Sequence, residues 1–264
     1  MGKRLAVEVT RKLLVKAISI IAITISACAN HSPSAIDTSG LVEVADITQN
    51  IESYIGRSVL VRNDIIETIG ERGFILDKDR AFAGDNILVI SISNLPFELT
   101  EENTPEVLVG GKVERFTLSD LQQRYNLNLD SNLYTPYENE PVIIAESLIL
   151  SPDPEDLTKN PEAYYNKPLA VEGELEDLKS YGVFELDEEQ AFGGEDLIVV
   201  QPKPRIKLKQ EQMAIVYGKL RPFIVVELER DYDLGWDLSV RQEIEAEYSQ
   251  KPVLVADKIQ LLKP

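Results

Sequence analysis

The sequence spells nearly the same six residues twice, as AFAGDN at residues 81–86 and as AFGGED at residues 191–196. At a shift of 110 residues, residues 46–90 align with residues 156–200 without a gap. The identical pairs are spread along the whole segment and include Asp46/Asp156, Tyr54/Tyr164, Phe74/Phe184, Leu76/Leu186 and Phe82/Phe192. The chain is therefore a duplication, and its fold has to be built from two copies of one module.

The correspondence resumes further along the chain. VLVGGKVERF (107–116) matches AIVYGKLRPF (214–223), and PVIIAESLIL (141–150) matches PVLVADKIQL (252–261). We place the two copies at residues 45–151, the first repeat, and 152–264, the second repeat. The linker Ser151-Pro152-Asp153-Pro154-Glu155 holds two prolines, which lack the N–H groups that strand pairing needs. We therefore expect two separate barrels without pairing between them.

Each copy follows one order of elements. A short helix is expected after Asp46 and after Asp156, with each aspartate as its N-cap. In the first repeat, alternating apolar residues predict strands at 58–69, 73–77, 86–92, 107–116 and 141–150, with a polar helix at 118–125. The paired Phe74/Phe184 and Leu76/Leu186 are expected in the core. Five short strands per copy indicate a mainly β protein with two small tandem barrels, each with short helices.

The N-terminal segment has the pattern of a secretory signal. Residues 1–16 are cationic, and residues 17–29 (AISIIAITISACA) carry no charge and are too few to cross a bilayer, which takes about 20 residues. The only cysteine, Cys28, lies at the end of this apolar run, after Ile25, Ser26 and Ala27. We expect a signal peptide at 1–27 and a tether at 28–44.

The stretch Ile25-Ser26-Ala27-Cys28 resembles the lipobox of bacterial lipoproteins, in which the cysteine is acylated, as with palmitate, and becomes the N-terminus. The body resembles the OB-fold and, more narrowly, secreted OB-like lipoproteins of bacteria. The likeness rests on Tyr54-Ile55-Gly56-Arg57-Ser58-Val59 and on Pro141-Val142-Ile143-Ile144-Ala145. Asn166 replaces Gly56 in the second repeat, and the clearest helix of each copy follows the fourth strand instead of the third. The resemblance implies an extracytoplasmic protein, lipid-anchored to a bacterial membrane.

The charge and the residue composition limit the functions that the chain can have. The chain has 27 Lys+Arg and 45 Asp+Glu; without residues 1–27 these become 22 and 44, a net charge of −22. Such a body repels phosphate backbones, so we expect no nucleic-acid partner. The only histidine, His31, lies on the tether, and phosphate-binding glycine loops are missing from the sequence. We therefore expect neither an enzyme nor a metal or cofactor.

Four aromatic residues are candidates for a binding surface. Phe82 and Phe192 lie in the repeated acidic loop. Each could be a platform on which a ligand stacks, or it could fold back and plug one end of the barrel. Tyr232 and Trp236 follow the fourth strand of the second repeat. They either anchor a protein partner or pack on the barrel. Acids near residues 77–85 and 187–196 do not match the spacing of an EF-hand loop, so solvated hairpins are favoured over Ca²⁺.

These features predict a membrane-anchored binding or scaffold protein without catalytic activity, with envelope proteins as its partners. Binding of an oligosaccharide or another small ligand is the alternative. Single-stranded nucleic acid is a more distant one, because the strands carry mainly acids instead of interleaved cations and stacking aromatics.

Overall fold

A computed structural model describes residues 40–77, 86–97, 105–187, 195–204, 206–249 and 251–263. All of them belong to one compact unit, which spans Ala35–Pro264. Within these residues the protein is mainly β, and ten strands form one sheet. The first five strands are β1 (Ser58–Ile69), β2 (Gly73–Asp77), β3 (Ile87–Ser91), β4 (Glu106–Arg115) and β5 (Pro141–Leu150). The other five are β6 (Pro168–Glu176), β7 (Val183–Asp187), β8 (Leu197–Val200), β9 (Met213–Pro222) and β10 (Pro252–Leu261).

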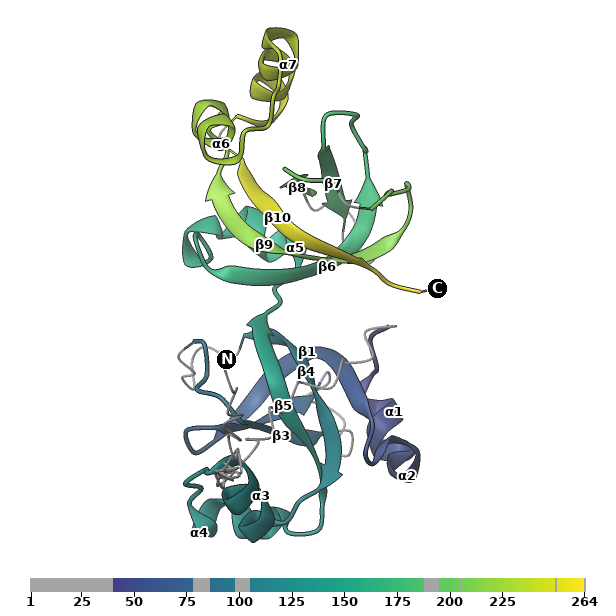
Figure 1. Cartoon of the computed structure of the whole chain (residues 1–264), viewed down its shortest axis with the longest axis vertical. Coiled ribbons are helices and arrows are strands. Elements are labelled where there is room, and N and C mark those ends of the chain that lie inside the picture. The colour runs from purple at the N-terminus through teal and green to yellow at the C-terminus, as the bar shows by residue number, and fades with distance from the viewer. Residues whose placement is uncertain are drawn as a thin grey trace, which may run out of the picture. The chain divides into compact units, whose positions relative to one another are not determined.

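The first five strands close into a barrel (Figure 1). Strand β1 pairs antiparallel with β2 on one side and with β4 on the other. Strand β2 pairs in turn with β3, and β4 pairs with β5. The closing contact is parallel and runs from the pair Leu88↔Val142 to the pair Ser91↔Ala145. This closed five-stranded barrel is consistent with the OB-like fold that the sequence predicts.

The other five strands belong to the same sheet. Strand β6 pairs with β7 and with β9, while β8 pairs parallel with β10, and β10 pairs with β9. One residue pair, Leu150↔Leu169, connects β5 to β6. The expectation of no pairing between the repeats is therefore wrong at this pair. The linker prolines begin at residue 152, so Leu150, at the end of β5, can still pair.

The helices of the described residues are short; the first two precede β1, and the others lie between strands. They are α1 (Val44–Gln49), α2 (Ile51–Tyr54), α3 (Leu118–Tyr125), α4 (Ser131–Tyr134), α5 (Pro154–Lys159), α6 (Val225–Tyr232) and α7 (Leu238–Tyr248), with 3₁₀ turns at Thr135–Tyr137 and Pro161–Ala163. As expected, α3 follows the fourth strand.

The predicted N-caps Asp46 and Asp156 are wrong, because both residues lie inside their helices. Helix α1 starts at Val44, which is buried, and the preceding Glu43 makes no side-chain cap bond. Helix α5 starts at Pro154, a residue well suited to the first helical position. Burial and proline geometry, and not a capping side chain, determine where these helices begin.

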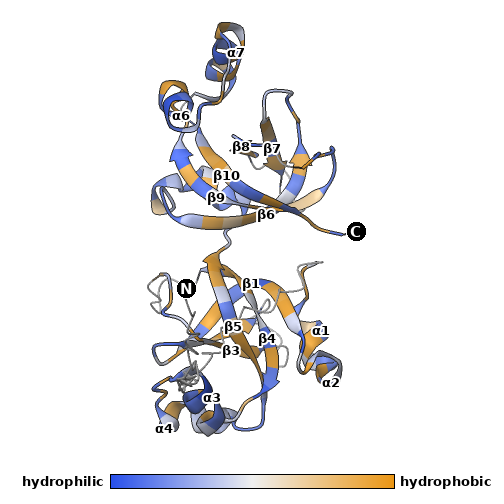
Figure 2. Cartoon of the chain, viewed as in Figure 1, coloured by the Kyte–Doolittle hydropathy of each residue, from blue (hydrophilic) through white to orange (hydrophobic). Residues whose placement is uncertain are grey.

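Strands β2 and β3 bury both of their faces. Phe74 and Leu76 on β2 and the matched Phe184 and Leu186 on β7 are all buried in the main hydrophobic cluster, which confirms the predicted core positions. Ile75, between Phe74 and Leu76, faces outward and packs in a second cluster with Leu121 of α3 and Tyr134 of α4. Figure 2 shows hydrophobic colour on the strands, whereas α3 is largely hydrophilic. An outer apolar layer under α3 and α4 therefore supports the site described next.

Candidate ligand-binding pocket

A pocket of about 480 Å³ opens where the turn between β1 and β2 meets the segment that joins α3 to α4. Its volume is in the range of small-molecule sites. The lining residues are Gly70, Glu71, Arg72, Asn128, Leu129, Asp130, Leu133 and Tyr134. The pocket therefore has an apolar part, one cation and two carboxylates.

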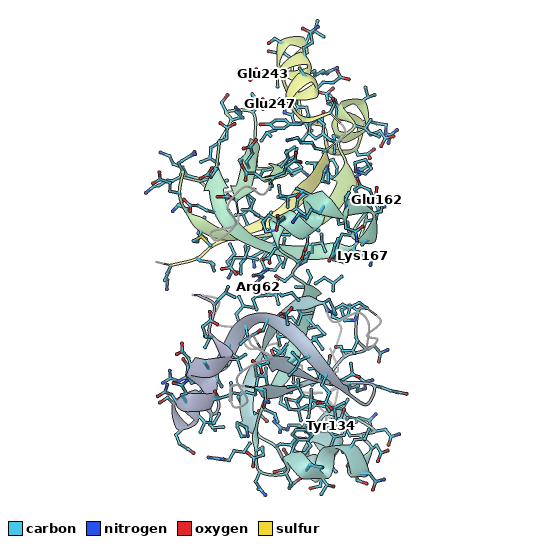
Figure 3. All side chains as sticks on the ribbon, turned by 180° about the vertical axis from the view of Figure 1, so that it is seen from behind. Arg62, Tyr134, Glu162, Lys167, Glu243 and Glu247 are labelled. Atoms are coloured by element: carbon cyan, nitrogen blue, oxygen red, sulfur yellow. The ribbon has the colours of Figure 1, made fainter. Side chains whose placement is uncertain are left out.

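Tyr134 forms a rigid part of the wall. Its side chain is buried, its ring lies 6.3 Å from that of Phe116, and its hydroxyl donates to the carbonyl oxygen of Ile69 at 2.5 Å. Burial raises the pKa of Tyr134 to about 12. A Cβ added at Gly73 would lie 2.7 Å from this hydroxyl, which explains why a glycine follows the turn. Figure 3 shows Tyr134 between the strands and the helices of the first repeat.

The local sequence sets the shape of the second wall. Asn126 ends α3 in the left-handed conformation, with φ at 53°, which asparagine adopts more readily than most residues. Asp130 then caps α4, because its carboxylate accepts a hydrogen bond from the backbone N–H of Asn132 at 2.9 Å. Leu133, the third residue of α4, is 44% exposed at the pocket. These turns place Leu129, Asp130 and Leu133 opposite the β1–β2 turn.

Arg72 provides the only positive charge in the pocket lining. Its Nη2 donates to Oδ1 of Asn94 at 2.9 Å, which fixes the guanidinium plane. Its Nη1 is buried and has no hydrogen-bond partner among the residues that the structure describes. A buried N–H group without a partner costs about 1–3 kcal/mol. Arg72 is also the one cation in the pocket lining, and a guanidinium binds carboxylate especially well.

The second repeat closes the equivalent place. The repeat alignment matches Leu129 with Trp236 and Glu71 with Tyr181. Trp236 is buried, and its indole N–H donates to the backbone carbonyl oxygen of Tyr181 at 3.0 Å. The larger side chain thus links the two segments whose counterparts line the pocket in the first repeat. The pocket is therefore a property of the first repeat and not an unavoidable consequence of the fold.

Of the residues predicted from the sequence as a binding surface, the structure describes Tyr232 and Trp236, and neither of them lines this pocket. Trp236 lies in the outer apolar cluster of the second repeat, and Tyr232 is half-buried beside it, with the Arg221 guanidinium carbon 5.8 Å from its ring centre. Their positions favour packing on the barrel over anchoring a partner. Cys28, Phe82 and Phe192 lie outside the described residues, as do half of the acids considered for Ca²⁺.

Sequence reasoning did not identify Arg72. A lone arginine in a turn carries no pattern, and its value as a ligand contact depends on the burial of one nitrogen atom. The repeat did contain a usable signal, because the position of Leu129 is occupied by Trp236 in the other copy. A large residue replaced by a smaller one at matched positions indicates a difference in filled volume.

No family model and no curated protein matches this chain. Within the described ranges, none of the helices is long and apolar enough to span a membrane.

Proposed function

We propose that the protein is a non-catalytic binding protein, anchored by a lipid outside the cytoplasm, whose first repeat binds a small zwitterionic ligand such as a free amino acid or a short peptide. The observation that carries the proposal is Arg72, the one cation in the pocket lining, whose buried Nη1 has no hydrogen-bond partner among the described residues. In this arrangement the guanidinium receives the carboxylate of the ligand. This choice favours small-ligand binding over the scaffold role that the sequence suggested first.

The charges of the pocket support the choice of a zwitterionic ligand. Glu71 and Asp130 line the same cavity as Arg72, so an ammonium group has acceptors near the site that holds the carboxylate. Leu129 and Leu133 offer apolar contact to a side chain. A ligand with negative charge alone would meet the −22 of the body and these two carboxylates, which weaken its binding. A zwitterion matches both signs.

A catalytic role has little support in this pocket. Its lining holds neither cysteine, serine nor histidine. The Tyr134 hydroxyl is engaged with Ile69, and its pKa of about 12 keeps it protonated at neutral pH. General acid–base chemistry favours a group whose pKa lies near the working pH. Binding is therefore the function that these residues perform best.

The test is a ligand screen by thermal unfolding and calorimetry with free amino acids and dipeptides, against glucuronic acid and glucose. We expect amino acids or dipeptides to raise the melting temperature, because a ligand at 100 times its Kd stabilises the folded state by about 2.7 kcal/mol. Arg72→Met should lose the effect, since it keeps the alkyl stem and removes the donors. Leu129→Trp should also lose it, by filling the pocket as Trp236 does in the second repeat.

The matched control is Arg115→Met, which removes an exposed arginine of the same barrel that pairs with Glu52. This variant should bind as the wild type does. Equal binding by wild type and Arg72→Met would refute the pocket. Preferential binding of glucuronic acid or glucose would refute the zwitterion and support the oligosaccharide alternative.

We also propose that Cys28 is acylated and that the strands β6–β10 act as a second OB-like barrel. The lipobox at residues 25–28 supports the first point, and the matched sequence of the repeats supports the second. Cys28→Ala should shift the protein from the membrane fraction to the soluble one, or leave the leader uncleaved. Membrane partition and mass identical to those of the wild type would contradict the anchor.

A further inference from the structure

The connector between β8 and β9 has a charge that is unusual for this acidic chain. Residues 203–209 read KPRIKLK, so four of the 22 cations of the body lie within seven positions. Lys203, Lys207 and Lys209 are exposed, and none of them forms an ion pair with another residue that the structure describes. Ile206, between them, is 40% exposed. We call Lys203, Ile206, Lys207 and Lys209 the basic segment.

The first repeat carries the opposite charge at the matching place. Its connector between β3 and β4, residues 92–105, contains three acids and neither lysine nor arginine. The connector of the second repeat, residues 201–212, contains four cations and one acid, Glu211. Both connectors join the third strand of their repeat to the fourth, so the barrel itself requires neither sign. The reversal therefore indicates that the second repeat uses this connector to meet a negatively charged partner.

The connector that carries the basic segment ends where the tether enters the body. It leads into β9 at Met213, whose carbonyl oxygen accepts a hydrogen bond from the backbone N–H of Leu262 at 2.9 Å. Leu262 and Leu41, near the start of the described chain, both pack against the small buried cluster that contains Ile215. Lys263, which follows Leu262, adds a further exposed cation. The end of the connector and the beginning of the body are therefore neighbours in the fold.

A lipid anchor at Cys28 would keep this side of the body close to a bilayer. Eleven residues, 29–39, separate Cys28 from the described body. Because an extended chain gains about 3.3–3.6 Å per residue, they span about 40 Å at most. Leu208, in the middle of the connector, packs against the main hydrophobic cluster, which holds the basic segment on the barrel. The anchor therefore brings the basic segment within reach of lipid headgroups.

We propose that the basic segment is a second membrane contact, which binds the anionic headgroups of the bilayer that holds the lipid anchor and places Ile206 at the interface. The inference rests on the acylation of Cys28 proposed above. Each lysine near an anionic membrane surface strengthens binding about fivefold. A basic patch beside a lipid chain is one of the combinations that give stable membrane attachment. The contact also orients the body, because it selects the face that meets the membrane.

The negative charge of the body is compatible with this local attraction. Salt at physiological concentration screens exposed charges that are more than about 8 Å apart, so the membrane responds mainly to the nearest side chains. Glu211 ends the connector, and Glu174 on β6 pairs with Met213, so the attractive surface is confined to the basic segment and Lys263. The other acidic faces are repelled by the same anionic surface and turn toward solvent.

The experiment uses the acylated protein, purified from membranes, in vesicles that contain phosphatidylglycerol and in vesicles of phosphatidylcholine alone. Acylation occupies the only cysteine of the chain, so Ile206→Cys carries a single environment-sensitive fluorophore. We expect its emission to rise on the anionic vesicles, to be quenched by lipids spin-labelled near the headgroup, and to fall again between about 50 mM and about 0.5 M salt. The same fluorophore at Val226, which is 78% exposed on α6, should remain in water.

Charge variants in the Ile206→Cys background test the lysines. Lys207→Gln combined with Lys209→Gln should weaken the contact about tenfold or more. The matched control combines Lys167→Gln with Lys219→Gln, two exposed lysines at the end of the β6–β9 pair away from Met213. It changes the net charge equally and should leave the contact as it is in the parent.

Flotation of the vesicles and the mass of the peptide that contains Cys28 test the anchor separately. If the protein floats with Cys28 acylated while the fluorophore at residue 206 stays in water on anionic vesicles, the membrane contact alone is refuted. Absence of both flotation and acylation would refute the anchor and the contact that rests on it. Equal weakening by both lysine pairs would refute a local contact. A signal that persists on phosphatidylcholine and grows with protein density would identify an acidic face of a second copy as the partner instead.

Discussion

The side chain of Arg62 connects strand β4, the linker between the repeats and strand β6. Its side chain, 15% exposed on β1, places Nη2 2.6 Å from both Glu106 and Asp153, and its Nε donates to the hydroxyl of Ser151 at 3.0 Å. Its Nη1 lies 3.7 Å from Glu172 of the second repeat. A buried arginine of this kind adds little net stability, but removing one partner leaves the others unpaired. The network therefore fixes the linker more than it strengthens the fold.

Glu106 makes this network sensitive to pH. Burial raises the pKa of Glu106 to about 8 from the ordinary 4.5, although the charge of Arg62 acts in the opposite direction. The folded protein thus holds this proton more tightly than the unfolded chain does. The contribution to stability is complete below pH 4.5 and is lost as the pH rises toward 8.

We predict that the free energy of unfolding falls more steeply between pH 5 and 8 in the wild type than in Glu106→Gln, by at least about 1 kcal/mol. Glutamine imitates the protonated carboxyl and cannot titrate. Urea unfolding at several pH values measures both curves, and the difference isolates Glu106 from the other carboxyls. Parallel curves would show that Glu106 does not titrate in this range.

Among the elements, strands were predicted well and helix starts were not. The apolar alternation of segments such as 58–69 and 141–150 is a local property, so the sequence gives the bounds of β1 and β5 as the structure has them. The start of α1 depends on the burial of Val44, which is a tertiary contact. The pocket was missed for the same reason, because Arg72 and Leu129 are 57 positions apart and meet only in the fold.

A β-bulge that occurs in both repeats explains why each has a glycine at the matched position. The pairing of β4 with β5 shifts so that Glu146 is left over, and the pairing of β9 with β10 leaves over the matched Asp257. Such bulges bend a strand, as a small barrel requires. Gly111 and its counterpart Gly218 lie opposite these bulges, where a Cβ would overlap a carbonyl oxygen of the neighbouring strand.

We expect Gly111→Ala and Gly218→Ala each to lower the free energy of unfolding by about 1–3 kcal/mol, the usual cost of overpacking. The neighbouring atoms are backbone, which cannot move aside cheaply. Gly40→Ala is the control, since nothing lies within 4 Å of its added Cβ. Chemical denaturation compares the three variants. Losses no larger than that of the control would mean that the bulges relax around a methyl group.

At the scale of the whole molecule, the two repeats share a small apolar contact. Leu60 and Leu108 of the first repeat form one buried cluster with Ala170 and Ile215 of the second. Ser151, at the junction, donates its hydroxyl hydrogen to the carbonyl oxygen of Ala170 at 2.5 Å. Together with the Leu150↔Leu169 pair, these contacts stabilise the arrangement of the repeats but supply few strand hydrogen bonds. Each repeat therefore keeps most of its pairing within itself.

The fragment 152–264 should fold on its own, with a lower free energy of unfolding than the intact chain. Its five strands pair with one another from β6 through β7, β8, β10 and β9, and the pairing of β9 with β6 returns to the start. Loss of Leu60 and Leu108 exposes Ala170 and Ile215, which accounts for the lower stability. A cooperative urea transition, with an m-value about half that of the intact body, and dispersed amide signals are the expected results. Fragment 45–151 serves as the reference for a closed barrel. If that fragment folds while 152–264 remains disordered, the second repeat depends on the first for its structure and is not an independent barrel.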